Sequence, residues 1–176
     1  MYKNQCASSM QYGNLSTIDA KDLVVYHSGV EQCKPGHYWS GVRDHFLIHY
    51  ILSGKGTFIF NEKTYHLTGG QGFLICPNML SFYQADMDEP WEYCWVGFHG
   101  RYAESYLKEI NIDAANPIFS CALNSTPEKP IFQMVEAQSR PVGRDFILTG
   151  LLYQFFAELA TTVECSHLNN GGQNTK

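Results

Sequence analysis

The most constraining feature of this sequence is a series of short apolar runs, separated by Gly, Pro and Asn, that extends from Leu23 to Phe98. Runs of this length with turn residues at close intervals are typical of antiparallel sandwiches and barrels. The sequence therefore predicts a mainly β fold, an antiparallel barrel. The predicted strands are Leu23–Tyr26, Phe46–Leu52, Thr57–Phe60, Thr64–Leu67, Gly72–Ile75, Leu80–Gln84 and Glu92–Phe98.

The segments between these runs predict tight turns. Gly54 and Gly56 flank Lys55 and tolerate positive φ. Asn61–Lys63 predicts a hairpin, and Thr68–Gly72 predicts a glycine-rich corner. Consecutive strands are therefore expected to run antiparallel.

After Gly100 the apolar spacing becomes helical, which predicts helices over Arg101–Ile110, Ile131–Ala137 and Asp145–Val163. The last of these carries an apolar stripe wider than one small barrel covers, so we expect a second copy of the chain to cover the rest. The predicted dimer contacts are Phe146, Leu148, Leu151, Leu152, Phe155, Phe156 and Leu159.

The polarity of the chain predicts four segments. These are a flexible arm over residues 1–20, a barrel over 21–100, a helical dimerisation region over 101–165 and a linker over 166–176. The chain has enough apolar residues to form a hydrophobic core, because 44% of its 176 residues are hydrophobic and 14% are aromatic.

Charge and cysteine usage narrow the class of protein. The net charge is −5, and Lys and Arg form no run of three, which argues against nucleic-acid binding by this segment. The N-terminus has no apolar signal core, and no stretch is long and apolar enough to span a bilayer. Six scattered cysteines without a C-x-x-C pair indicate free thiols in a reduced, cytoplasmic protein.

Three aromatic residues near the end of the barrel segment are candidates for ligand binding. Trp91, Tyr93 and Trp95 alternate along one predicted strand, so their side chains project to the same side. Large aromatics on one inward face either fill a barrel or line a cavity in which a sugar ring can stack. Both interpretations stay open at this point.

A polar cluster precedes and enters the second predicted strand: Arg43, Asp44, His45 and His49. A buried Arg or His needs a partner, and a polyhydroxylated ligand can supply one. Alternatively, Arg43 pairs with Asp44 or Asp86 at the barrel rim.

The combined motifs resemble the sugar-sensing and dimerisation domain of AraC-family transcriptional regulators, a cupin barrel of the jelly-roll type. The matching runs are Val42–Gly56, Asn61–Leu67, Gly70–Pro77, Tyr83–Asp86 and Pro90–Gly100. The resemblance implies a sugar or related small metabolite as effector, a homodimer, and DNA binding through helix-turn-helix units that lie outside this sequence.

The resemblance also implies that Trp95 stacks on the effector, with Tyr93 and Tyr83 beside it. Together with the patterns above, the predicted ligand-binding residues are Arg43, His49, Tyr83, Trp91, Tyr93 and Trp95. The arabinose sensor of this family has an arginine where this chain has Ser53, which argues for a different or larger ligand.

Catalytic and metal motifs are not found in the sequence. His45 and His49 do not form the His-x-His of metal cupins, and no histidine follows the Pro77 corner. There is no G-x-S-x-G and no P-loop, and Cys76 and Cys94 lie among apolar neighbours. We therefore expect no metal, no cofactor and no enzymatic activity.

Two alternatives to effector sensing remain. The first is a structural dimerisation module whose barrel is filled by its own aromatic residues, which predicts no ligand effect on melting. The second is a cupin-type sugar isomerase or epimerase, which predicts metal uptake or turnover.

Overall fold

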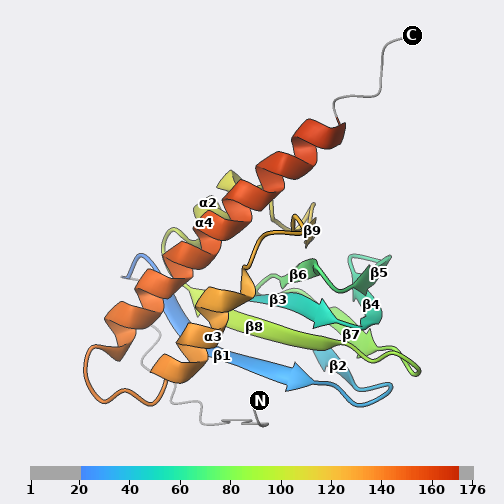
Figure 1. Ribbon diagram of the computed structural model, residues 1–176, viewed down its shortest axis with the longest axis horizontal. Helices are drawn as coiled ribbons and strands as arrows, with labels where there is room; N and C mark the ends of the chain where they lie inside the picture. Colours follow the sequence, from blue (N-terminus) through green and yellow to red (C-terminus); the bar gives the residue numbers. More distant parts are fainter. Residues whose placement is uncertain (1–20, 171–176) are drawn as a thin grey trace.

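Two antiparallel sheets packed face to face form the body of the molecule (Figure 1). The computed structural model describes residues 21–170, with side chains described up to Thr161. The first sheet has the order β1 (Val24–Gln32), β8 (Glu92–His99), β3 (Phe46–Ser53), β6 (Gln71–Ile75) and β9 (Ile118–Ser120). The second has the order β2 (Tyr38–Gly41), β7 (Ser81–Ala85), β4 (Lys55–Phe60) and β5 (Lys63–Thr68). The predicted mainly β, jelly-roll architecture is confirmed.

All the predicted strands are present, but two short strands were not predicted and β1 is much longer than predicted. β1 continues to Gln32 rather than ending at Tyr26, because a bulge between Val25 and His27 shifts its register and lets pairing with β8 continue. β2 was missed because its four residues do not form an apolar run. β9 was missed because it is a three-residue edge strand.

The predicted hairpin between β4 and β5 is confirmed as a two-residue turn. Asn61 and Glu62 both have positive φ, 48° and 62°. This combination is the one in a type I′ turn, whose twist matches that of the flanking strands.

The central strand β3 is covered on both faces, so its residues from Phe46 to Ile51 are all buried. His49 packs against Tyr83 of the second sheet, and Phe98 on the neighbouring β8 packs against Phe156 of the helical layer. The first sheet thus has one face toward the second sheet and one toward the helices.

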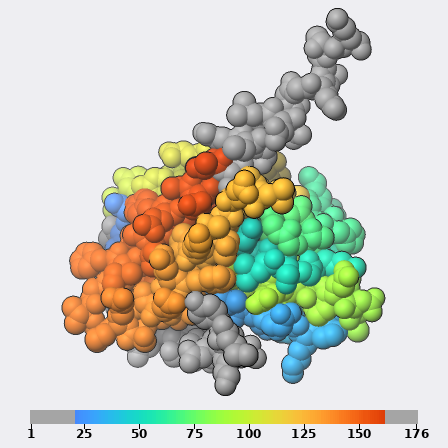
Figure 2. All heavy atoms as spheres, in the orientation of Figure 1, coloured from blue at the N-terminus to red at the C-terminus, as the bar shows by residue number. Residues whose placement is uncertain are grey.

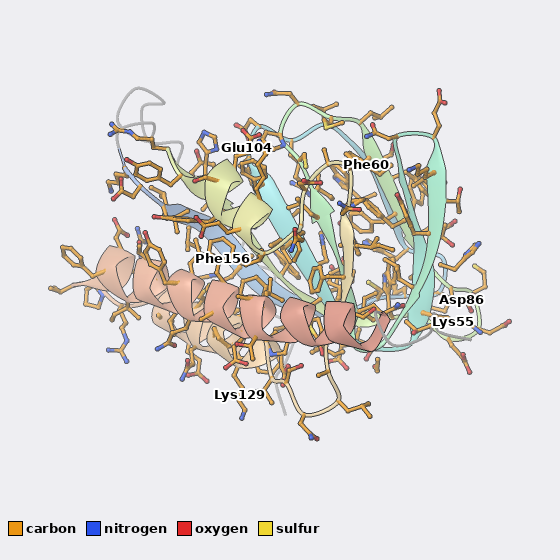
Figure 3. The ribbon with its side chains drawn as sticks, turned by 90° about the horizontal axis from the view of Figure 1, so that it is seen from above. Lys55, Phe60, Asp86, Glu104, Lys129 and Phe156 are labelled. Carbon is orange, nitrogen blue, oxygen red and sulfur yellow. The ribbon has the colours of Figure 1, made fainter. Side chains whose placement is uncertain are left out.

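Three helices follow the barrel strands: α2 (Ala103–Glu109), α3 (Glu128–Ala137) and α4 (Arg144–Asn170). α3 and α4 lie against one another and cover β1 (Figure 1). In the space-filling view they form one side of the molecule, and the strands form the other (Figure 2). Phe156 points from α4 toward the sheet (Figure 3). All three predicted helices are confirmed.

α4 is longer than predicted at its C-terminal end. It continues to Asn170, so residues 166–170, predicted as linker, are helical. Nothing in the sequence breaks a helix before Gly171 and Gly172. The predicted arm over 1–20 and the rest of the predicted linker, 171–176, lie outside the described residues.

The dimer contacts predicted on α4 need correction. Leu148, Leu152, Phe155, Phe156 and Leu159 are buried within the single chain. The prediction is wrong for these five residues, because the stripe that they form is already covered by the barrel and its neighbouring helices. Phe146 remains 88% exposed, and Leu151 is half-buried.

Two further features concern the cysteines and the helices of the described residues. Cys33, Cys76, Cys94 and Cys121 are free cysteines. None of the helices within residues 21–170 combines the length and apolarity that a bilayer-crossing segment requires.

Candidate functional site at the mouth of the barrel

Aromatic side chains from both sheets surround His49 in the barrel interior. The ring centroid of His49 lies 4.6 Å from Phe73, 5.0 Å from Tyr83, 4.8 Å from Tyr93 and 6.4 Å from Trp95. The imidazole is only 2% exposed. The structure therefore brings together His49, Tyr83, Tyr93 and Trp95, all of which were predicted as ligand-binding residues.

Trp91 shares the inward side with Tyr93 but belongs to the packed end of the barrel. It is 0% exposed and stacks on Phe73 at 5.8 Å. Its indole lies over Gly56, where any side chain would overlap it. The prediction that Trp91 lines an open hollow is wrong, because aromatic packing fills this end of the barrel.

Away from Trp91, each sheet carries one half-buried indole, and we call this end of the aromatic cluster the mouth of the barrel. Trp39 of β2 stacks on Tyr83 at 5.7 Å, and Trp95 of β8 lies on the opposite sheet. The guanidinium carbon of Arg43 sits 4.3 Å above the Trp39 ring, within range of a cation–π interaction. Trp39 was missed in the sequence because β2 was missed.

Several buried polar atoms have no hydrogen-bond partner among the described residues. They include Nε of Arg43, Nδ1 of His49 and Oγ of Ser81. Leaving a buried polar group unpaired costs about 1–3 kcal/mol. Such atoms are the ones that a polar ligand can satisfy.

The predicted pairing of Arg43 with a rim carboxylate is not observed. Asp44 Oδ1 instead accepts a hydrogen bond from His45 at 2.7 Å. Asp86 Oδ1 accepts from the backbone N–H groups of Asp88 and Glu89, and Asp86 lies with Lys55 at one end of the molecule (Figure 3). No carboxylate of the described residues lies within ion-pair distance of Arg43.

A chain of hydrogen bonds runs along the mouth from Trp95. The indole Nε1 of Trp95 is 3.0 Å from Nδ1 of His27, and Nε2 of His27 is 2.9 Å from Nε2 of His45. His45 then contacts Asp44 as described above. His27 was not among the predicted site residues, because the first predicted strand ended one residue earlier. The bulge before His27 extends the strand through this position.

Two glycines leave room for the rings of Trp95 and His27 against the neighbouring strands. Gly29 pairs with Trp95 across β1 and β8, and Gly97 pairs with His27. A Cβ atom on Gly29 would overlap the indole, and one on Gly97 would approach the imidazole too closely. Each ring can therefore lie flat across the neighbouring strand.

Burial keeps the imidazole groups and the Tyr83 hydroxyl around the mouth neutral. It lowers the pKa of His27 to about 4, with further lowering from His45 and Arg43. It also lowers the pKa of His45 and of His49, and it raises the pKa of Tyr83. The hydroxyl and imidazole groups thus offer neutral hydrogen bonds at physiological pH.

Another polar contact of the aromatic cluster comes from Glu31, which was not predicted from the sequence. The Tyr93 hydroxyl donates to Oε2 of Glu31 at 3.2 Å. Within the described part of the chain, no three His, Cys, Asp or Glu side chains converge to form a metal-binding group. The arrangement is suited to stacking and hydrogen bonding.

Comparison with known proteins gives a consistent result. The chain is 32% identical over 164 residues to the Msm operon regulatory protein of Streptococcus mutans. This match covers 90% of this chain and 58% of that protein. It is 45% identical over 91 residues to the raffinose operon transcriptional regulatory protein RafR of Pediococcus pentosaceus, covering 50% of this chain and 32% of that protein. It is 30% identical over 118 residues to the lactose operon transcription activator of Staphylococcus xylosus, covering 67% and 42%. The chain thus spans at most about three-fifths of the length of these relatives.

A solved structure has a similar fold. Apo ToxT from Vibrio cholerae superimposes with a TM-score of 0.54 at 14% identity, over 81% of this chain and 58% of that chain. The model of the AraC-like ligand binding domain matches residues 24–156, a range that extends from β1 into α4 and includes every residue of the barrel mouth. On this match and the curated relatives, the chain belongs to the family of AraC-like ligand-binding domains.

Proposed function

We propose that this chain is the effector-binding and dimerising part of a transcription regulator, and that its effector is a sugar bound at the barrel mouth and not chemically altered. The observation that carries the proposal is a half-buried indole on each of the two sheets, Trp39 and Trp95, with the guanidinium carbon of Arg43 lying 4.3 Å from the Trp39 ring. Indole faces pack on the C–H faces of a pyranose ring, and a guanidinium donates to its hydroxyl groups.

The unpaired polar atoms support the same type of ligand. Nε of Arg43 and Nδ1 of His49 are buried without partners among the described residues. A polyhydroxylated molecule carries donors and acceptors on several sides, so it can pair with both. Since Trp91 closes the deep end, the ligand contacts Trp95, Trp39 and Arg43 at the mouth.

The names of the relatives suggest which sugars to test first. RafR is named for a raffinose operon and the Staphylococcus xylosus activator for a lactose operon, and both sugars contain galactose. The position of Ser53 argues for a ligand different from arabinose, as the sequence resemblance predicted. We therefore propose a galactoside, an oligosaccharide in particular.

Dimerisation is proposed through the outer side of α4. Phe146, Gly150, Tyr153 and Ala157 follow one another at helical spacing, and all four are exposed. A side chain at Gly150 would meet no other atom within 4 Å, so a second helix can approach closely there. We propose a cytoplasmic homodimer whose DNA-binding part lies outside this sequence.

In the proposed mechanism, effector binding changes the relative stability of two arrangements of the regulator. A coupling of about 1–3 kcal/mol is typical of such allosteric proteins. The DNA-binding part would respond to this shift in population.

Isothermal titration calorimetry of the chain with raffinose, lactose, arabinose and glucose tests this function. We expect heat from a galactoside, loss of that heat in Trp39→Ala and Arg43→Gln, and normal heat in Arg140→Gln, which replaces an exposed arginine. NMR spectra of the sugar should be unchanged after incubation, whereas an isomerase would convert it. The packed Trp91 end supports a second candidate, a purely structural module, which predicts no heat from any sugar.

A further inference from the structure

The hydrogen bonds between Trp95 and Asp44 have one possible direction. An indole N–H donates and cannot accept, so Nδ1 of His27 is the acceptor for Trp95. His27 therefore carries its proton on Nε2 and donates to Nε2 of His45. His45 in turn carries its proton on Nδ1 and donates to the Asp44 carboxylate.

We propose that Asp44, His45 and His27 are positioning residues that hold the indole of Trp95 in the orientation that the effector requires. The inference rests on the proposed function, because Trp95 is taken to stack on the effector. Positioning is needed because Gly29, beneath the indole, contributes no side chain that could hold the ring from the β1 side. A ring fixed before binding loses less conformational entropy when the ligand arrives.

The chain of hydrogen bonds from Trp95 through His27 and His45 to Asp44, here called the relay, depends on both histidines being neutral. A protonated His27 would direct an N–H group at the N–H of Trp95, and a protonated His45 would direct one at His27. The charged and titratable groups that act on these two imidazoles are Arg43, Asp44, His49 and His99. Asp44 favours the protonated form of His45, whereas desolvation and Arg43 oppose it.

Ring ¹H–¹⁵N correlation spectra of the ligand-free chain at neutral pH test the relay itself. We expect His27 as the Nε2–H tautomer and His45 as the Nδ1–H tautomer, which is the less common form of a free imidazole. A protonated His45, or His45 with its proton on Nε2, would overturn the proposal. Because no sugar is present, this result does not depend on the proposed function.

Two variants of His27 then test the effect on Trp95. In His27→Asn the amide oxygen replaces Nδ1 as acceptor, whereas His27→Leu removes the acceptor. Exchange of the Trp95 indole proton with solvent should stay slow in the first variant and become about tenfold faster in the second, as expected for the loss of one hydrogen bond. His66→Leu, on an exposed histidine of β5, should leave the exchange rate unchanged.

Affinity for the sugar identified by calorimetry should follow the same order. His27→Asn should bind within about threefold of the original chain, and His27→Leu about tenfold more weakly. Equal affinities in the two variants would overturn the positioning role even if the tautomers are as expected. If no sugar binds at all, the proposed function fails, and the tautomers and indole exchange still decide whether the relay exists.

Discussion

The side-chain amide of Gln138 donates to both the carbonyl oxygen and the Oγ of Ser28, at 2.8 and 2.7 Å. Gln138 is the C-cap residue of α3, and Ser28 lies in β1 between His27 and Gly29. Neighbouring strand residues face opposite sides, so this stretch of β1 contacts Trp95 with one side and α3 with the other. The proposed effector site and the helical layer therefore share one piece of strand.

Removing this connection should destabilise the fold. Gln138→Ala leaves the buried Ser28 hydroxyl without this donor, and we expect the free energy of unfolding to fall by about 1–3 kcal/mol. Urea denaturation followed by circular dichroism measures it. Gln133→Ala, at an exposed position of the same helix, is the control and should change stability by less than about 0.5 kcal/mol. Equal effects in both variants would contradict a specific contact.

Gly29 should tolerate a methyl group only when Trp95 is absent. Because the added Cβ overlaps the indole, Gly29→Ala should cost about 1–3 kcal/mol of unfolding free energy. In a Trp95→Ala background the overlap is gone, and the same change should be neutral or stabilising. A double-mutant cycle in urea measures the difference. Additive effects would show that the ring does not rest on Gly29.

Stability should decrease as the pH is lowered from about 6.5 toward 4. The pKa of His27 is about 4 in the folded chain, against 6.5 as its ordinary value, so in this range the unfolded chain binds a proton that the folded chain does not. Each such histidine contributes a slope of up to about 1.4 kcal/mol per pH unit, with full stability above pH 6.5. His45 and His49 shift in the same direction. Urea denaturation at several pH values should give a smaller slope for His27→Asn than for the original chain, and equal slopes would contradict a neutral, buried His27.

The proposed dimer should dissociate when a charge is placed on the outer side of α4. Phe146 is 88% exposed in the single chain, so Phe146→Glu should leave the fold intact and place a charge in the interface. Sedimentation velocity should then show a monomer. Leu123→Glu, at a residue that is 104% exposed in the connection before α3, should remain dimeric. A monomeric original chain would refute dimerisation through this segment.

The strands and helices could be predicted because their patterns are local. Apolar runs with glycine turns and a shift to helical spacing after Gly100 are properties of neighbouring residues. The alternation of residues along β8 also predicted that its aromatic side chains share one side of the strand. The ring centroids of Tyr93 and Trp95 are 5.8 Å apart, in agreement with this prediction.

What could not be predicted depends on contacts between distant residues. Which of the aromatics fill the barrel and which remain at the mouth is decided by packing between sheets, as the burial of Trp91 against Phe73 illustrates. His27 enters the site through a bulge that leaves no local signature, and Gly29 and Gly97 gain meaning only when strand pairing is known. Likewise, the apolar stripe of α4 does not reveal that most of it is used within one chain.

The proposed binding site is best tested by a crystal structure of the chain with the sugar that gives the largest calorimetric heat. We expect a pyranose ring packed on the indole of Trp95 at the barrel mouth, with a sugar oxygen within hydrogen-bond distance of the Arg43 guanidinium. Sugar density elsewhere on the molecule, with Trp95 and Arg43 making no contact to it, would refute the proposed site.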